Sequence, residues 1–187
     1  MAPEEIYELQ CLISNNSDTR ALEKVYLYFY PKLFSFTKTL VSQAEPAEEI
    51  VEDVFIRLWE NRAELSRISN LKVYLFVAVR NRALNYLEWK SRDIISYCET
   101  YPVDIPTSHN IPDNLMMTKE MAMKINQAVD SLPPKCKLIF KLVREEQLKY
   151  REVADILSIS PRTVDTQMTI ATKKIASAIN LYLTSAH

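Results

Sequence analysis

The sequence of 187 residues contains no glycine, which limits both the turns and the sites that the chain can form. A Walker loop or a dinucleotide-binding fingerprint needs glycine, because backbone amides must approach a phosphate closely. Both motifs are therefore excluded. Only His109 and His187 could supply a histidine-based catalytic or metal site. Carboxylates are plentiful, so an acid/base pair stays open, but no motif supports one. We expect a protein that is not an enzyme and uses no metal or cofactor.

The sequence also indicates a cytoplasmic protein. It has no long apolar run and no basic-then-apolar leader, so neither a membrane span nor a secretion signal is expected. The cysteines Cys11, Cys98 and Cys136 are far apart and odd in number. Such a set fits reduced thiols better than a disulfide framework.

Apolar residues recur at helical spacing along most of the chain. Two stripes, at 6–13 and at 22–29 before Pro31, predict two helices. Pro46 is well placed at the start of a third, which runs through Trp59. A loop is expected over Asn61–Asn70, followed by a helix from about Leu71 to Arg92.

A proline-rich, acidic stretch then separates two helical regions. Residues 96–114 contain three prolines and three acids without a lysine or arginine, a composition typical of a linker. Helical spacing resumes near Thr118, and Asp130–Pro134 marks a break before another helix. We therefore predict an all-α fold of two small domains, at 1–95 and 118–187, joined by a flexible acidic linker at 96–117.

Charge changes sign sharply within the first predicted domain. Seven acidic residues stand against Arg57 and Arg62 between Glu45 and Glu64, whereas six basic residues stand against Glu88 between Arg67 and Arg92. The first segment suits a basic partner and the second suits nucleic acid. Two solvated faces that pair with each other remain an alternative.

A helical wheel of the segment from Leu71 to Arg92 places apolar residues on one side and a mixed set opposite. The expected core face holds Val73, Phe76, Val77, Leu84 and Leu87. The opposite face would hold Tyr74, Ala78, Asn81, Arg82, Asn85, Trp89 and Arg92. Aromatic, amide and arginine side chains together suit the binding of unstacked bases. Packing of Tyr74 and Trp89 under another helix remains open.

The segment from Val153 to Gln167 has the spacing of a helix-turn-helix. Ala154 is small where the two helices would cross, and Ile159 and Val164 flank the bend as apolar anchors. Ser160 is the expected N-cap of the second helix, with Pro161 at its first position. Without glycine, Ser158 is expected to take the left-handed turn conformation at a cost of about 1 kcal/mol.

Taken together, these segments resemble the extracytoplasmic-function sigma factors of bacterial RNA polymerase. EEIVEDVFIRLWENR is similar to the family's polymerase-binding helix, and YLFVAVRNRALNYL to its promoter-melting and −10-reading helix. The segment from Leu132 to Ile175 is similar to its −35-reading domain. Gln147 and Ser158 stand where the family often has glycine.

The resemblance implies an alternative sigma factor that binds core polymerase, through the coiled coil of the largest subunit and the flap, and promoter DNA. An anti-sigma factor is a further implied partner. The polymerase-binding residues would be Glu49, Glu52, Asp53, Phe55, Leu58 and Trp59. Those for the −10 element would be Arg62, Ser66, Arg67, Asn70, Lys72, Tyr74, Arg80, Asn81, Arg82 and Asn85. Those for the −35 element would be Ser160, Arg162, Thr163, Thr166, Gln167, Lys173 and Lys174.

Two other functions remain open at this point. One is a two-domain helix-turn-helix regulator whose first domain senses a ligand or dimerises, which a palindromic binding site would favour. The other is a helical interaction module, for which absent or salt-insensitive DNA binding would be evidence.

Overall fold

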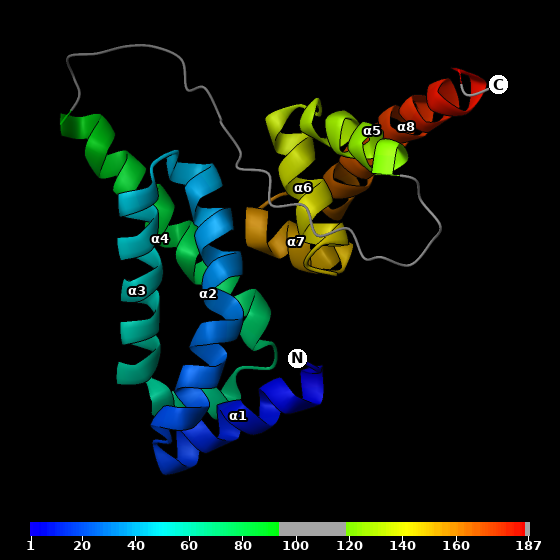
Figure 1. Ribbon diagram of the computed structural model, residues 1–187. Helices are drawn as coiled ribbons and strands as arrows, with labels where there is room; N and C mark the ends of the chain where they lie inside the picture. Colours follow the sequence, from blue (N-terminus) through cyan, green and yellow to red (C-terminus); the bar gives the residue numbers. More distant parts are fainter. Residues whose placement is uncertain (94–118, 186–187) are drawn as a thin grey trace. The chain divides into compact units, whose positions relative to one another are not determined.

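The computed structural model describes residues 1–93 and 119–185, and every regular element in these ranges is helical (Figure 1). The all-α fold predicted from the sequence is therefore confirmed. The chain divides into two compact units, Met1–Ile105 and Pro106–His187. The predicted linker at 96–117 and both predicted domain boundaries lie outside the described residues.

The first unit is built around its second helix. It contains α1 (Pro3–Asn16), α2 (Thr19–Val41), α3 (Ala44–Glu60), the 3₁₀ helix η1 (Arg62–Arg67) and α4 (Leu71–Asp93). Helix α2 packs against α1, α3 and α4, and α1 packs against η1 (Figure 1). Residues at a spacing of four along α2 fill the core, namely Ala21, Val25, Phe29 and Leu33.

Pro31 does not end α2, although the sequence predicted a helix before it. The helix continues for ten more residues, to Val41, with an exposed Pro31 inside it. A proline within a helix costs about 3 kcal/mol or more. Burying Leu33 and Phe36 beyond it contributes about 1.5–3 kcal/mol each, because both extend the apolar stripe that precedes the proline. Tertiary packing therefore outweighs the local effect.

The segment predicted as a loop, Asn61–Asn70, contains η1, and a buried glutamine on α1 holds it. The side-chain amide of Gln10 donates to the carbonyl of Leu65 and, at 2.7 Å, to that of Ile68. Gln10 and Leu65 are both almost fully buried. The segment between α3 and α4 is thus fixed from 55 residues away in the sequence.

The second unit is a helical bundle in which the last helix contacts the other three. It contains α5 (Lys119–Asp130), α6 (Pro134–Arg144), α7 (Tyr150–Leu157) and α8 (Pro161–Ser185). Val129, Leu132, Cys136 and Ala171 form a buried cluster. The break at Asp130–Pro134 is confirmed, and Lys137 pairs with Asp130 across it at 2.7 Å.

The predicted bend between α7 and α8 is also confirmed. Ser158 takes the left-handed conformation at φ 52° and ψ 49°. Ala154 and the predicted anchor Val164 are buried, whereas the other predicted anchor, Ile159, is half-buried. Gln147, before α7, has a φ of 54°. Both positions that would suit glycine therefore have left-handed backbone without it.

Candidate nucleic-acid and partner-binding surfaces

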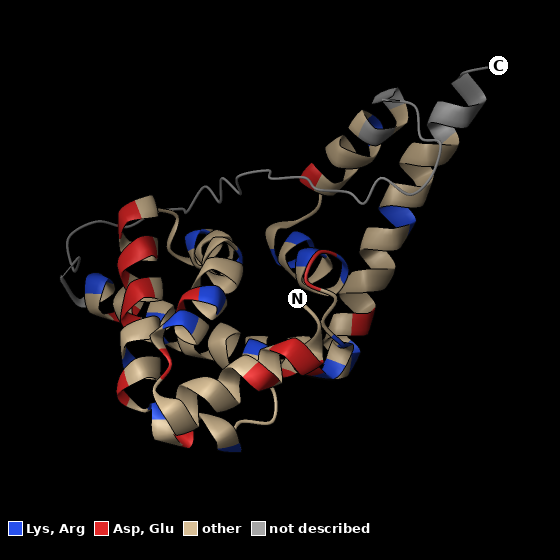
Figure 2. Cartoon of the chain, turned by 60° about the horizontal axis from the view of Figure 1, so that its bottom comes forward, with Lys and Arg blue, Asp and Glu red and all other residues tan. Residues whose placement is uncertain are grey.

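Helix α3 exposes a stripe that we call the acidic face, made of Glu45, Glu49, Glu52, Ile56 and Glu60. These positions recur every three or four residues, so they share one side of the helix, and all five are exposed. Figure 2 shows acidic residues along α3. Within the described residues, none of the four glutamates is held in an ion pair with a basic residue. The face therefore has negative charge available for a partner.

The apolar residues predicted for a polymerase contact on α3 lie in other places. Phe55 and Leu58 are buried, so they hold α3 in the core. Trp59 is partly buried, and the guanidinium of Arg62 lies 4.6 Å from the centre of its ring. Ile56 is 58% exposed in the middle of the acidic face. The sequence analysis missed Ile56, although its position between Glu52 and Glu60 on the stripe could have indicated it.

Tyrosines of α2 border α3. The Tyr30 hydroxyl donates to Glu48 at 3.1 Å, and the Tyr26 ring packs edge-on against Phe55 at 4.9 Å. Burial, and then the Glu48 carboxylate, raise the pKa of Tyr30 to about 12. This hydroxyl therefore stays protonated and donating at neutral pH.

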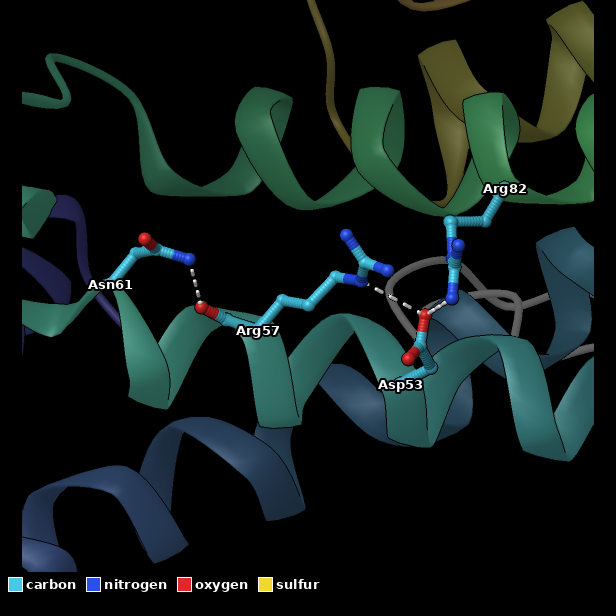
Figure 3. Close-up of polar contacts among 4 residues, drawn as sticks. All are labelled: Asp53, Arg57, Asn61 and Arg82. Carbon is cyan, nitrogen blue, oxygen red and sulfur yellow. Dashed lines mark hydrogen bonds and ion pairs between the residues drawn. The ribbon is translucent and has the colours of Figure 1, made fainter.

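The carboxylate of Asp53 joins α3 to α4. Figure 3 shows Arg82 of α4 and Arg57 of α3 both reaching Asp53, and the Arg57 Nε lies 3.3 Å from the same oxygen that Arg82 binds. Asn61 in turn donates to the carbonyl of Arg57 at 2.9 Å. Asp53 was predicted for the polymerase surface and Arg82 for the DNA surface. The structure brings these two side chains together in one ion pair.

The core face of α4 differs from the one that the helical wheel predicted. The buried residues are Leu71, Leu75, Phe76, Val79 and Ala83. Of the predicted set only Phe76 is buried, Val73, Val77 and Leu87 are half-buried, and Leu84 is 42% exposed. The prediction was wrong because α4 has apolar residues on most of its sides, and packing against α2 and α3 selects the face.

Four residues of the predicted mixed face of α4 are exposed, namely Tyr74, Asn81, Asn85 and Trp89. Ala78 is half-buried. Arg80 is half-buried and donates to the Asn81 amide oxygen at 3.2 Å. The side chain of Arg92 lies outside the described residues. The exposed members form an aromatic and amide surface along α4, without Arg82.

Several residues predicted to contact the −10 element hold the unit together. Arg62 donates to the Ser17 hydroxyl at 2.8 Å and to the Trp59 carbonyl at 3.0 Å. The Asn70 side chain caps α4 by accepting from the amide of Val73 at 3.1 Å. Arg67 is exposed and pairs with Glu64. Ser66 is exposed and Lys72 is half-buried.

The start of α8 is fixed by hydroxyl groups. The Ser160 hydroxyl accepts from the amide of Thr163 at 3.0 Å, as predicted for the N-cap, and lies 2.8 Å from the Thr163 hydroxyl. The Thr166 hydroxyl donates to the carbonyl of Arg162 at 2.9 Å. Both threonines therefore have local hydrogen bonds, while the exposed guanidinium of Arg162 has none with the described residues.

The exposed stripe of α8, opposite buried Val164, Met168 and Ala171, consists of Arg162, Thr166, Thr169 and Lys173, with Ile170 beside it. Of the other predicted residues, Gln167 is half-buried and Lys174 donates to the carbonyl of Ser131. Thr169 and Ile170 were missed by the sequence analysis. Thr169 is four residues and Ile170 three residues before Lys173, so both lie on the same side of the helix as Lys173.

These features define a helical protein with an exposed acidic helix face in one unit and a helix-turn-helix in the other. Two family models match the same parts of the chain: Sigma-70 region 2 over residues 25–93 and Sigma-70, region 4 over residues 122–175. The chain belongs to the sigma-70 family. It is an alternative RNA polymerase sigma factor of the extracytoplasmic-function type, a class of transcription initiation factors that are not enzymes.

The chain is also similar to known sigma factors in sequence and in fold. The extracytoplasmic-function sigma factor SigW of Bacillus subtilis is 20% identical over 158 residues, which are 81% of this chain and 84% of SigW. A probable sigma factor of Haemophilus influenzae is 30% identical over 64 residues, and the match spans only 33% of that protein. The fold resembles that of the sigma factor RpoE from Bartonella quintana, solved with the anti-sigma factor NepR. The TM-score is 0.56 at 19% identity, covering 84% of this chain and 96% of RpoE.

Within the described part of the chain, no helix is both long enough and apolar enough to cross a bilayer.

Proposed function

We propose that the acidic face of α3 binds core RNA polymerase, through a basic surface of the coiled coil in its largest subunit. The observation that carries this proposal is an exposed Ile56 surrounded by glutamates that no described basic residue neutralises. An apolar centre with a polar, solvent-accessible rim is the usual anatomy of a protein interface. The glutamates would steer association, and Ile56 would be buried in the complex.

The exposed surface of α4 would hold the −10 element as a single strand. The Tyr74 ring supplies a surface on which a base can stack, and the amides of Asn81 and Asn85 can bond to base edges. Ser66 in η1 would contact the same single strand. Arg62, Asn70 and Arg82 would act indirectly, because their side chains fix η1 and α4.

Helix α8 would read the −35 element as duplex DNA. A recognition helix enters the major groove with its leading residues toward the base edges, as the bend at Ser158 would allow. Arg162 can bond to a guanine, while Lys173 and Lys174 can reach phosphates. Ser160 and Thr163 would fix the start of the helix, and Thr166 and Gln167 would lie along the groove. The second unit would also contact the polymerase flap.

An anti-sigma factor would regulate the protein by covering these surfaces. RpoE, which has a similar fold, was solved with such a partner, NepR. The charged helix α3 and the exposed stripe of α8 are the surfaces on which a competing protein would act. The protein would work in the cytoplasm, where polymerase and promoter DNA meet.

Run-off transcription from fragmented genomic DNA tests the proposal directly. Core polymerase supplemented with the protein is expected to start transcription at a defined set of sites that core polymerase alone does not use. The start sites should share two sequence elements, upstream at about −10 and −35. If the protein leaves the transcripts of core polymerase unchanged, the proposal is wrong, and a regulator or an interaction module becomes the better explanation.

A further inference from the structure

The recognition helix α8 exposes one large apolar side chain among polar groups. Ile170 is 43% exposed, whereas the apolar residues Val164, Met168 and Ala171 of the same helix are buried in the core. Its neighbours on the outer side, Thr166, Thr169 and Lys173, are all exposed. Ile170 is therefore placed on the surface that would face DNA.

Packing in the core does not explain why this position is isoleucine, because much of the side chain is exposed. A residue needed only for helix formation could be alanine, lysine or glutamate, each of which has a higher helix propensity than isoleucine. Isoleucine has no hydrogen-bond donor or acceptor in its side chain, so it can contact neither a phosphate nor a polar base edge productively. The Ile170 side chain can contribute to binding free energy only by burying its apolar surface away from water.

The major groove offers one apolar group, the C5-methyl of thymine. Thr166 lies one turn before Ile170, and its hydroxyl is bonded to the carbonyl of Arg162. That hydrogen bond fixes the Thr166 side chain on the outer side of the helix, one turn before Ile170. Ile170 and Thr166 can thus form an apolar contact beside the guanidinium of Arg162, which can bond to a guanine.

We infer that Ile170 is a specificity-determining residue that contacts the methyl group of a thymine in the −35 element. The inference rests on the proposed reading of duplex DNA by α8 and adds the base and the atom that are recognised. A thymine at one −35 position is favoured over cytosine, which lacks the methyl group. The contact contributes sequence preference with little dependence on salt, because no ion is released.

The test removes a single methyl group from the DNA. Holoenzyme is formed from core polymerase and the full chain, and a promoter is taken from the run-off experiment. Each thymine of its −35 element is then replaced in turn by deoxyuridine, which pairs identically but lacks the methyl. At one position, wild-type holoenzyme is expected to bind about fourfold more weakly to the uracil promoter, as for one lost apolar group.

Two variants assign that effect to Ile170. For the Ile170→Ala holoenzyme, the uracil and thymine promoters should bind equally at this position, whereas Ile170→Val should keep most of the discrimination. Leu27→Ala, which removes an exposed apolar side chain from α2, serves as a control and should discriminate as the wild type does.

Two results would overturn the inference while leaving the proposed function in place. One is that replacing each thymine of the −35 element by deoxyuridine leaves the binding of wild-type holoenzyme unchanged. The other is a methyl effect of the same size in Ile170→Ala. If no promoter is found at all, the proposed function fails first, so the two failures are distinguishable.

Discussion

The carboxylate of Asp53 on α3 binds the guanidinium of Arg82 on α4, and this ion pair joins the helix of the acidic face to the helix with the exposed asparagines. Arg57 donates to the same carboxylate oxygen from one turn further along α3. The side chains of Arg82 and Asp53 are 37% and 34% exposed. Water therefore weakens the electrostatic attraction between them. The two proposed surfaces are therefore held in a fixed relation within the first unit.

We expect the pair to make a small contribution to stability that a double-mutant cycle can measure. Asp53→Asn and Arg82→Met should each lower the free energy of unfolding by up to about 1 kcal/mol. The double variant should lose less than the sum, because either change alone already breaks the ion pair. Urea unfolding of all four proteins measures this coupling. Strictly additive losses would mean that the two side chains do not interact in solution.

A second prediction concerns Ile56 in the acidic face. Ile56→Ala should leave stability nearly unchanged because the side chain is exposed, yet weaken binding to core polymerase by more than about 1 kcal/mol, roughly fivefold. Titration of labelled core polymerase measures the affinity. Leu27→Ala, on α2, is the matched control and should bind as the wild type does. Equal binding by all three proteins would exclude Ile56 from the interface.

The buried amide of Gln10 leads to a third prediction. Gln10→Met keeps a side chain of similar length but leaves the carbonyls of Leu65 and Ile68 without this donor. We expect a loss of about 1–3 kcal/mol in the free energy of unfolding, the usual effect of an unsatisfied buried group. Amide exchange should accelerate first in η1. Unchanged exchange there would show that η1 does not depend on Gln10.

The features predicted correctly from the sequence are those with local causes. The bend at Ser158 follows from apolar anchors, a serine cap and a proline within a few residues of one another. A helix start or turn of this kind is encoded by neighbours in the sequence, so spacing alone indicates it.

The features that the sequence did not indicate depend on distant partners. Asp53 and Arg82 are 29 residues apart, and Gln10 and Leu65 are 55 apart, so no local pattern pairs them. The core face of α4 was misassigned for a related reason. Its apolar residues surround the helix, and only the neighbours α2 and α3 decide that Leu75 and Val79 turn inward while Leu84 faces water. Ile56 and Ile170 are different, because their spacing from Glu52, Glu60 and Lys173 is a local signal that places them on the exposed stripes.

The left-handed residue Ser158 provides a fourth prediction. Ser158→Gly relieves the steric cost of a side chain at φ 52° but increases the entropy of the unfolded chain, and the two terms, each about 1 kcal/mol, nearly cancel. We expect unchanged or slightly higher stability. Ser158→Val should instead destabilise by about 1–2 kcal/mol or more, since a β-branched residue is least suited to this conformation. Thermal unfolding compares them, and a stable valine variant would contradict the left-handed turn.

The last prediction separates base reading from phosphate binding on α8. Arg162 is exposed in the first turn and has no partner among the described residues, so Arg162→Ala should leave stability nearly unchanged. If its guanidinium bonds to a guanine, the change should cost about 1–3 kcal/mol of binding free energy and relax the preference at one −35 position.

Lys173 lies three turns further along the exposed stripe, where it can reach a phosphate. Lys173→Ala should weaken transcription from all −35 variants alike and reduce the salt dependence of binding. Transcription by the two holoenzymes from a panel of −35 variants at two salt concentrations distinguishes the patterns. If Arg162→Ala changes neither promoter strength nor sequence preference, α8 does not read DNA through its leading turn.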